Sequence, residues 1–324
     1  MTPTSTTTGE TKEKCGWLRF RLRTLLVLTT VICVWLAFKA KVAHDQRVAV
    51  AAIREVGGEV LYDYQFNEDG AFQDKATPWA PAWLRNAIGE DYFVTVVGVS
   101  FLTSSARGGG TYTYNTQVTD ATLRQLIPLR RLRYLFVRST QVTDDGLETI
   151  GDMQGLERLR VSGPRVTDVG VAHLARLERL KLLSITAQRV SDAAMPYVAR
   201  IESLEDLEIR GGQVTNDGLI PIKNLPNLRV LTLYGNTMTG IAGTQITDAG
   251  LRHVAELKQL EVLWINNMEV THFGLGQLEQ LSNLRSVNFF MTSAPLDGLE
   301  TLQQALPKTQ IHASSGGGVL YATP

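Results

Sequence analysis

The stretch QVTDDGLETIGDMQGLERLRVSGP, residues 141–164, is followed directly by RVTDVGVAHLARLERLKLLSITAQ, residues 165–188. The two stretches share the phrase VTD near the start and place their apolar residues at the same positions. A fixed period of about two dozen residues predicts a solenoid, in which each unit stacks only on its neighbours. Copies begin at Gln117, Gln141, Arg165, Arg189, Gln213, Gln245 and Glu269.

Apolar residues recur at positions 7, 10, 13, 16, 19 and 21 of each copy. In the third copy, Val171, Leu174 and Leu177 are three apart, as on one face of a helix. Leu183 and Ile185 are two apart, as on one side of a β-strand. We therefore expect each unit to be a short helix, a turn and a strand, with both apolar faces turned inward.

The phrase VTD precedes the expected helix of most copies. Threonine or aspartate at this place caps free helix N–H groups, and a carboxylate meets the positive end of the helix dipole. A row of calcium-binding aspartates is the alternative, but Asn216 and His272 replace the aspartate in two copies and favour capping. The glycine two residues after the aspartate predicts close packing against the adjacent coil: Gly146, Gly170, Gly218, Gly250 and Gly274.

The pattern VTDxGLxxLxxLxxLxxLxLxxx resembles leucine-rich repeats of the ribonuclease-inhibitor-like, cysteine-containing subtype, over residues 93–316. The resemblance implies a right-handed α/β solenoid with a parallel sheet on the concave face and helices outside. The chain lacks the cysteines and the asparagine ladder of that subtype. It also lacks a helical F-box segment, so the substrate-adaptor role of many members is not expected. The layout is similar to that of bacterial leucine-rich-repeat proteins with a single membrane anchor.

The N-terminal region predicts a membrane segment. Residues 1–18 read as a disordered polar tail. Within residues 19–41, an apolar run from Thr24 to Phe38 is flanked by basic residues on both sides, which favours an uncleaved transmembrane signal-anchor. The alternatives are a cleaved signal peptide, whose A-x-A site at 49–51 lies far downstream, and a buried core helix, which rarely carries basic clusters at both ends.

Basic residues set the expected orientation of this segment. Five precede the run between Lys12 and Arg23, and three follow it between Lys39 and Arg47. The positive-inside rule then places the N-terminus in the cytoplasm and the repeats on the exoplasmic or periplasmic side. An intracellular adaptor is the alternative. The two cysteines are Cys15 and Cys33, so no disulfide framework is expected in the repeats.

Residues 42–116 are expected to form a membrane-proximal segment and an N-terminal cap. They predict a helix that ends at Gly57, a strand over 59–66, a further helix from Trp83 and a strand containing Val97 and Val99. The repeats are expected over 117–316, with Lys308 in place of a core leucine marking a C-terminal cap. We expect residues 317–324 to be a frayed, flexible tail.

Strand positions 18, 20 and 22 alternate with the buried ones and predict the exposed concave face. Exposed aromatic residues and arginines are the types that anchor protein interfaces. The alternative is that these side chains pack on one another or form a solvated charged face. The loop 237–244, an insertion between two copies, is a second candidate. The concave candidates are Tyr134, Phe136, Arg138, Arg158, Arg160, Asp206, Glu208, Tyr234, Trp264, Asn266 and Phe290.

Composition and motifs argue against other functions. The chain has 32 basic and 32 acidic residues, so no nucleic-acid surface is expected. The five histidines are scattered and no catalytic motif is present, so we expect no enzyme, no metal, no cofactor and no small-molecule substrate. The sequence favours a membrane-anchored module that binds a protein or peptide. A structural protein that self-associates at the membrane is the alternative.

Overall fold

The computed structural model describes residues 22–67, 72–73, 76–102, 114–210, 212–235, 244–315 and 318–322. The chain divides into two compact units, Met1–Ala43 and His44–Pro324. Three expectations fall outside the described residues: the polar tail 1–18, the loop that the glycine run 108–110 predicts between the cap and the first repeat, and all of the insertion 237–244 except Thr244.

Helix α1, Leu22–Glu55, is a single helix of 34 residues. The helix expected to end at Gly57 is the C-terminal part of α1, which is continuous because no proline or glycine interrupts the chain between Phe38 and Glu55. By length and composition α1 is apolar enough to cross a membrane, with the apolar window fully exposed. Its last turns are buried at Ala49 and Ile53, and the helix stops before Gly57, which has a positive φ of 75°.

A small cap precedes the coils. It comprises β1 (Glu59–Tyr62), the 3₁₀ turn η1 (Asp63–Gln65), α2 (Ala82–Ile88), the 3₁₀ turn η2 (Glu90–Tyr92) and β2 (Val96–Ser100). Strand β1 pairs antiparallel with β2, and β2 pairs parallel with β3. The cap therefore occupies the sheet edge that the first coil would otherwise expose. The expected strand at 59–66 is present only in its first four residues.

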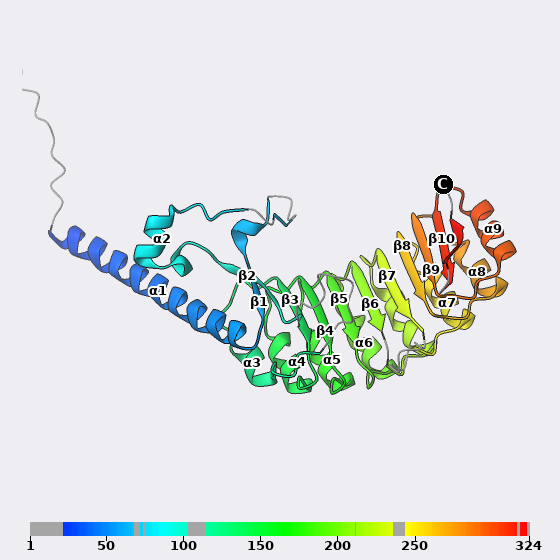
Figure 1. Ribbon diagram of the computed structural model, residues 1–324, viewed down its shortest axis with the longest axis horizontal. Helices are drawn as coiled ribbons and strands as arrows, with labels where there is room; N and C mark the ends of the chain where they lie inside the picture. Colours follow the sequence, from blue (N-terminus) through cyan, green and yellow to red (C-terminus); the bar gives the residue numbers. More distant parts are fainter. Residues whose placement is uncertain are drawn as a thin grey trace, which may run out of the picture. The chain divides into compact units, whose positions relative to one another are not determined.

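The coils form one sheet of eleven strands in sequential order (Figure 1). Strands β2 to β10 run parallel, as the helix-turn-strand unit predicts. The strands are β3 (Tyr134–Arg138), β4 (Arg158–Ser162), β5 (Leu182–Thr186), β6 (Asp206–Arg210), β7 (Val230–Tyr234), β8 (Val262–Asn266), β9 (Ser286–Phe290), β10 (Gln310–Ser315) and β11 (Gly318–Ala322).

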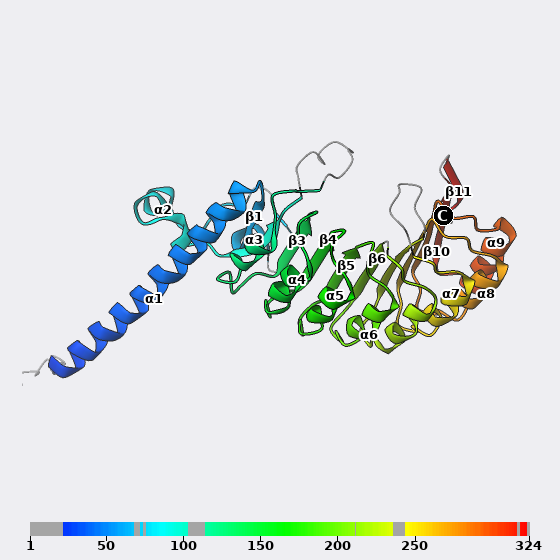
Figure 2. The ribbon, with the colours of Figure 1, turned by 90° about the horizontal axis from the view of Figure 1, so that it is seen from below.

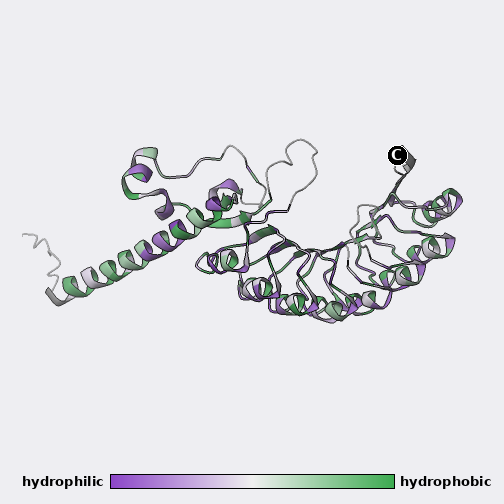
Figure 3. Ribbon diagram, turned by 60° about the horizontal axis from the view of Figure 1, so that its bottom comes forward, coloured by the Kyte–Doolittle hydropathy of each residue, from purple (hydrophilic) through white to green (hydrophobic). Residues whose placement is uncertain are grey.

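Short helices cover the other side of each coil. Within His44–Pro324, the strands line the inner side of an arc and the helices line its outer side (Figure 3). The helical elements are α3 (Asp120–Arg124), α4 (Asp144–Gly151), α5 (Asp168–Leu174), η4 (Asp192–Ala194), α6 (Met195–Val198), η5 (Asp217–Leu219), η6 (Pro221–Asn224), α7 (Asp248–Val254), α8 (His272–Leu278) and α9 (Leu296–Ala305).

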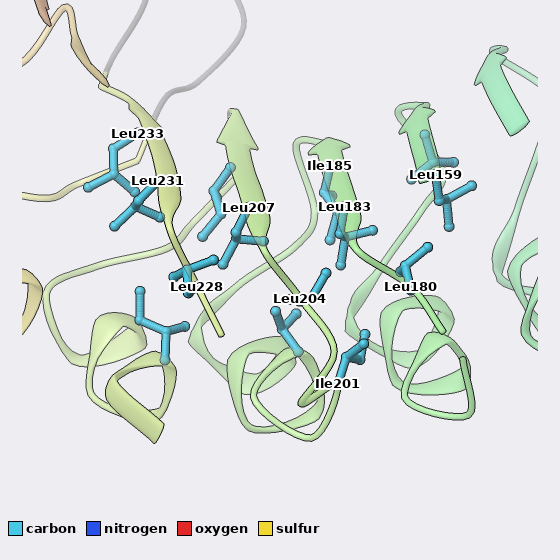
Figure 4. Close-up of a cluster of buried hydrophobic side chains, with 14 of the residues drawn as sticks. Leu159, Leu180, Leu183, Ile185, Ile201, Leu204, Leu207, Leu228, Leu231 and Leu233 are labelled. Atoms are coloured by element: carbon cyan, nitrogen blue, oxygen red, sulfur yellow. The ribbon is translucent and has the colours of Figure 1, made fainter. Parts of the chain in front are cut away.

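The predicted core positions are confirmed. In the third copy the five residues at positions 7 to 19 are fully buried, and Ile185 at position 21 is 2% exposed. Leucines of successive coils pack on one another between the strands and the helices (Figure 4). Each such side chain contributes about 1.5–3 kcal/mol by leaving water, but only because the neighbouring coil covers it.

The C-terminal end differs from the expected frayed tail. Gly318–Ala322 forms β11, which pairs antiparallel with β10 (Figure 2). Val319 and Tyr321 have a high propensity for strands, and the free edge of β10 offers unpaired backbone groups that such a strand satisfies. The sheet therefore has an antiparallel strand at both ends.

The residue directly before each strand from β3 to β9 carries a charge that alternates in sign along the solenoid. At position 17 of successive coils the charge changes sign from one coil to the next, so each residue has an opposite charge beside it. The ion pairs measure 2.8, 2.9, 2.6 and 3.3 Å in the order of the chain. This order opposes any coil register that would place like charges together. The pairs are Arg133–Glu157, Lys181–Glu205, Arg229–Glu261 and Arg285–Glu261.

Candidate functional site

The VTD phrase has a structural role on the helical side. Thr143 is the N-cap of α4, and its hydroxyl oxygen accepts the backbone N–H of Asp145. This confirms that threonine caps the helix. The aspartate acts differently from the expectation: Asp120 accepts the backbone N–H of Thr143 at 2.9 Å and the hydroxyl of Thr143 at 2.7 Å, 23 residues later in the chain.

The same aspartate–threonine link joins most successive coils. It recurs from Asp144 to Thr167, with both carboxylate oxygens used, and from Asp168, Asp192 and Asp248 to the next coil. Asn216 keeps the link to Thr247 with its amide oxygen. The row of aspartates is therefore accounted for by contacts between coils.

The recurrent glycine leaves room for this aspartate, which confirms the prediction of close packing. A Cβ at Gly170 would overlap Asp144 Oδ1, and the same holds for Gly146 against Asp120. Ala194 takes the place of the glycine in one coil, and that coil opens with the 3₁₀ turn η4 instead of an α-helix.

The regular residues are thus structural, which leaves the inner face of the sheet as the candidate site. Strand register aligns its outward residues in three rows that cross the strands. The middle row runs Phe136, Arg160, Ser184, Glu208, Thr232, Trp264 and Asn288.

The C-terminal half of this face carries aromatic residues. Trp264 on β8 is 41% exposed and Phe290 on β9 is 50% exposed. Tyr234 on β7 is partly exposed, and the guanidinium carbon of Arg210 lies 3.8 Å from the centre of its ring. These side chains contribute nothing to the core on the other side of the sheet.

The N-terminal half carries arginines stacked on aromatic rings. Arg160 lies 5.9 Å from the ring centre of Phe136, and Arg158 lies 5.8 Å from that of Tyr134. Arg138 lies 4.6 Å from the ring of Tyr114, which precedes the first coil. Arg158 and Arg160 are both exposed, so an anionic partner can reach their guanidinium groups.

Two carboxylates on β6 lie two strands away from Arg158 and Arg160 on β4. Asp206 and Glu208 point to the same face, and burial raises the pKa of Asp206, with a further rise from Glu208. Arg160 and Arg158 act in the opposite direction. Glu208 forms a long ion pair of 3.6 Å with Arg210 on its own strand.

Two of the predicted concave residues are not exposed. Tyr134 is 7% exposed, because Phe66 of the cap stacks on its ring with 5.0 Å between ring centres. Asn266 is 4% exposed and donates a hydrogen bond to the carbonyl of Leu233 at 3.4 Å. For these two the prediction of exposure is wrong, and Phe136, Arg138 and Tyr234 are only partly exposed.

The sequence reasoning missed the exposed tryptophans of the cap. Trp79 and Trp83 are 75% and 71% exposed. Together with Trp35 and Trp264, they make every tryptophan in the described residues at least 41% exposed. These four tryptophans are therefore all solvent-exposed, and the sequence signal was that none of them occupies a core position of the repeat.

Two histidines lie beside carboxylates in the described residues, and His253 Nδ1 lies 3.6 Å from Glu256 Oε1. His272 Nε2 lies 2.8 Å from Asp297 Oδ1, but the two side chains are 62% and 78% exposed. Among the described residues, a cavity of about 320 Å³ lies at the strand entrances beside Arg229, Glu261 and Arg285, and no histidine lines it. The exposed pair lacks the enclosure that acid–base chemistry uses.

The fold and this surface define an α/β solenoid of leucine-rich coils with a mixed aromatic and charged inner face. No protein-family model matches the chain, and no curated protein matches it. Solved structures similar to it include two internalins of Listeria monocytogenes strain 4b F2365, and internalins are leucine-rich-repeat proteins.

The likeness to both internalins is distant. The first internalin is 22% identical with a TM-score of 0.44, over 63% of this chain and 59% of the internalin, so the chain matches less than two thirds of its length. Internalin C2 is 20% identical with a TM-score of 0.47, over 82% of this chain and 92% of that one. The architecture described above rests on the chain's own coordinates.

Proposed function

We propose that this chain is a membrane-anchored, non-catalytic recognition module that binds a protein or peptide on the concave face of its sheet. The membrane anchor is the apolar part of α1, and the repeats face the exoplasmic or periplasmic side. The bound partner is a polypeptide, because the face combines aromatic, cationic and anionic groups instead of a single charge or an enclosed cavity.

The observation that carries the proposal is the aromatic cluster of the C-terminal half. Trp264 and Phe290 are large, exposed and rigid, and they stand on a sheet that holds them in fixed positions. Tryptophan and tyrosine at the centre of an interface provide much of its binding energy when a partner covers them. The core of the solenoid is complete without them.

Capture by crosslinking tests this proposal. The full chain is expressed in its native membrane, crosslinked, and its bound proteins are identified. Replacing Trp264 and Phe290 by alanine is expected to remove the specific partners, because truncation of a central aromatic residue costs about 2–4 kcal/mol of binding.

Phe273→Ala is the matched control. Phe273 is an exposed phenylalanine, 63% accessible, on the helical side in α8. It removes a similar apolar surface from the opposite side of the coil. An unchanged capture profile in the concave variant, with circular dichroism confirming its fold, would contradict the proposal. Loss of self-crosslinked oligomers in Phe273→Ala alone would favour the assembly role instead.

The orientation has a separate test. Cysteines occur only at positions 15 and 33, so the solenoid itself has none. In a chain with Cys15→Ser and Cys33→Ser, Gln188→Cys at an exposed position therefore supplies one cysteine that reports the side on which the coils lie. Labelling of Gln188→Cys by a membrane-impermeant maleimide in intact cells supports an exoplasmic domain. Labelling only after permeabilisation would indicate the intracellular adaptor.

A further inference from the structure

The middle row of the concave face alternates large and small side chains. Arg160, Glu208 and Trp264 stand on β4, β6 and β8, and strand register places Ser184 and Thr232 between them. Ser184 is 6% exposed, so it offers little to a ligand. The row therefore presents a cation, an anion and an aromatic ring in order, each on every second strand.

The spacing of these three groups matches an extended polypeptide. Neighbouring strands lie about 4.8 Å apart, so every second strand repeats after about 9.6 Å. A polyproline II helix has three residues per turn and rises about 9.3 Å per turn, so every third side chain faces the same way at this interval. A β-strand is a poorer match, because its residues i and i+3 point to opposite faces.

The charges of the row favour opposite charges in a partner, beyond the long 3.6 Å ion pair that Glu208 forms with Arg210. Arg158 lies next to Arg160 on the same face of β4, and Asp206 lies next to Glu208 on the same face of β6. Among the described residues, neither arginine forms an ion pair with either carboxylate. The raised pKa of Asp206 has burial as its first cause and the Glu208 charge as its second, and a cation placed beside the two carboxylates would offset the repulsion between their charges.

We infer that the concave face binds a polyproline II peptide segment that carries an acidic residue, a basic residue and a large apolar residue at intervals of three. The acidic residue lies over Arg160, the basic residue over Glu208, and the apolar residue over Trp264. This inference rests on the proposed recognition function and specifies the chemistry of its ligand.

Synthetic peptides test the order of the charges. The matching peptide is Asp-Pro-Pro-Lys-Pro-Pro-Leu, in which the prolines hold the polyproline II form in advance. The charge-swapped control is Lys-Pro-Pro-Asp-Pro-Pro-Leu, which has the same composition and length. Each peptide is synthesised with the sequence as written and with the sequence reversed, and each carries a terminal fluorophore. Binding to the detergent-solubilised full chain is followed by fluorescence anisotropy. We expect the better direction of the matching peptide to bind at least about tenfold more tightly than the control, because charge complementarity discriminates between partners.

A charge-reversed protein is the decisive variant. In the double substitution Arg160→Glu with Glu208→Lys, the preference is expected to change to the control peptide, which a general loss of fold cannot produce. Arg179→Glu with Glu178→Lys is the matched control, because it reverses two adjacent charges in the turn between α5 and β5, and it is expected to leave the preference unchanged.

The outcomes separate this inference from the proposed function. Equal affinity for both peptides, or a preference that survives the charge reversal, overturns the charge order. If native partners are still lost on replacing Trp264 and Phe290 but kept in the charge-reversed protein, the recognition function stands and the peptide chemistry is wrong. If neither change affects capture, both the recognition function and the proposed peptide chemistry are refuted.

Discussion

Replacing Asp144 by alanine is expected to loosen the contact between two neighbouring coils. Asp144 lies in the first turn of α4, and its two carboxylate oxygens accept the Thr167 backbone N–H at 2.8 Å and the Thr167 hydroxyl at 2.6 Å. The substitution removes both bonds and leaves the cap of the next helix without its partner. The carboxylate is partly buried, so water replaces it only in part.

The magnitude follows from the two lost bonds. A hydrogen bond to a charged group contributes about 1.5–3 kcal/mol, and partial exposure reduces each one. We expect a total loss of about 2–4 kcal/mol, against about 0.3–1 kcal/mol for the helix dipole alone. Asp145→Ala is the matched control, because Asp145 is exposed in the same turn and shares the helix dipole without joining the ladder.

Two assays measure the effect on the detergent-solubilised full chain. Urea denaturation followed by circular dichroism gives the change in unfolding free energy. Hydrogen exchange at the amide of Thr167 reports the local opening, because that amide is the donor to Asp144. The reasoning is refuted if the two alanine variants differ by less than about 0.5 kcal/mol and exchange at Thr167 is unchanged.

A double-mutant cycle tests the same contact from the other side. Gly170→Ala places a Cβ on Asp144 Oδ1 and is expected to destabilise the native chain. In the Asp144→Ala background that oxygen is absent, so the cost should fall by at least about 1 kcal/mol. Additive effects would show that the glycine is needed for another reason.

Three further predictions follow. Binding of the matching peptide is expected to weaken as pH falls through the pKa of Asp206, because protonation removes one of the charges that attract the lysine of the peptide. Anisotropy titrations at decreasing pH measure this affinity, and an affinity that does not change with pH contradicts the prediction. Glu261→Gln leaves two arginines without their shared carboxylate and is expected to cost about 1 kcal/mol, whereas Glu205→Gln, which frees a single lysine, should cost less in the same urea assay. Truncation after Ser315 removes β11 and uncovers the edge of β10, so light scattering should detect concentration-dependent association; a monodisperse truncated chain would show that β11 does not protect the edge.

Much of the fold was predictable because the same apolar core positions recur in all seven copies of the repeat. A residue such as Leu180 is buried wherever coils stack, since its period alone turns it inward. The ends of the solenoid were less predictable. The continuity of α1 follows from the absence of proline and glycine between Phe38 and Glu55, whereas β11 forms because the edge of β10 is there to pair with it.

The candidate face was predictable in outline only. Alternation along a strand correctly placed Trp264 and Phe290 outward and exposed. It also placed Tyr134 outward, but whether an outward residue meets water depends on what else folds over it. The ring of Tyr134 is covered by Phe66, which lies 68 positions earlier in the chain. The period of the repeat does not predict this contact.

The sequence by itself determined the repeating unit, its buried leucines and the threonine caps, because these depend on residues close together in the chain. Only the tertiary structure decided that aspartates bind the following coil, that opposite charges of neighbouring coils form ion pairs, and that Phe66 of the cap covers Tyr134. These relations join residues one or more coils apart. Stacking brings them together, and the distance between stacked strands sets the interval at which a partner must place its own groups.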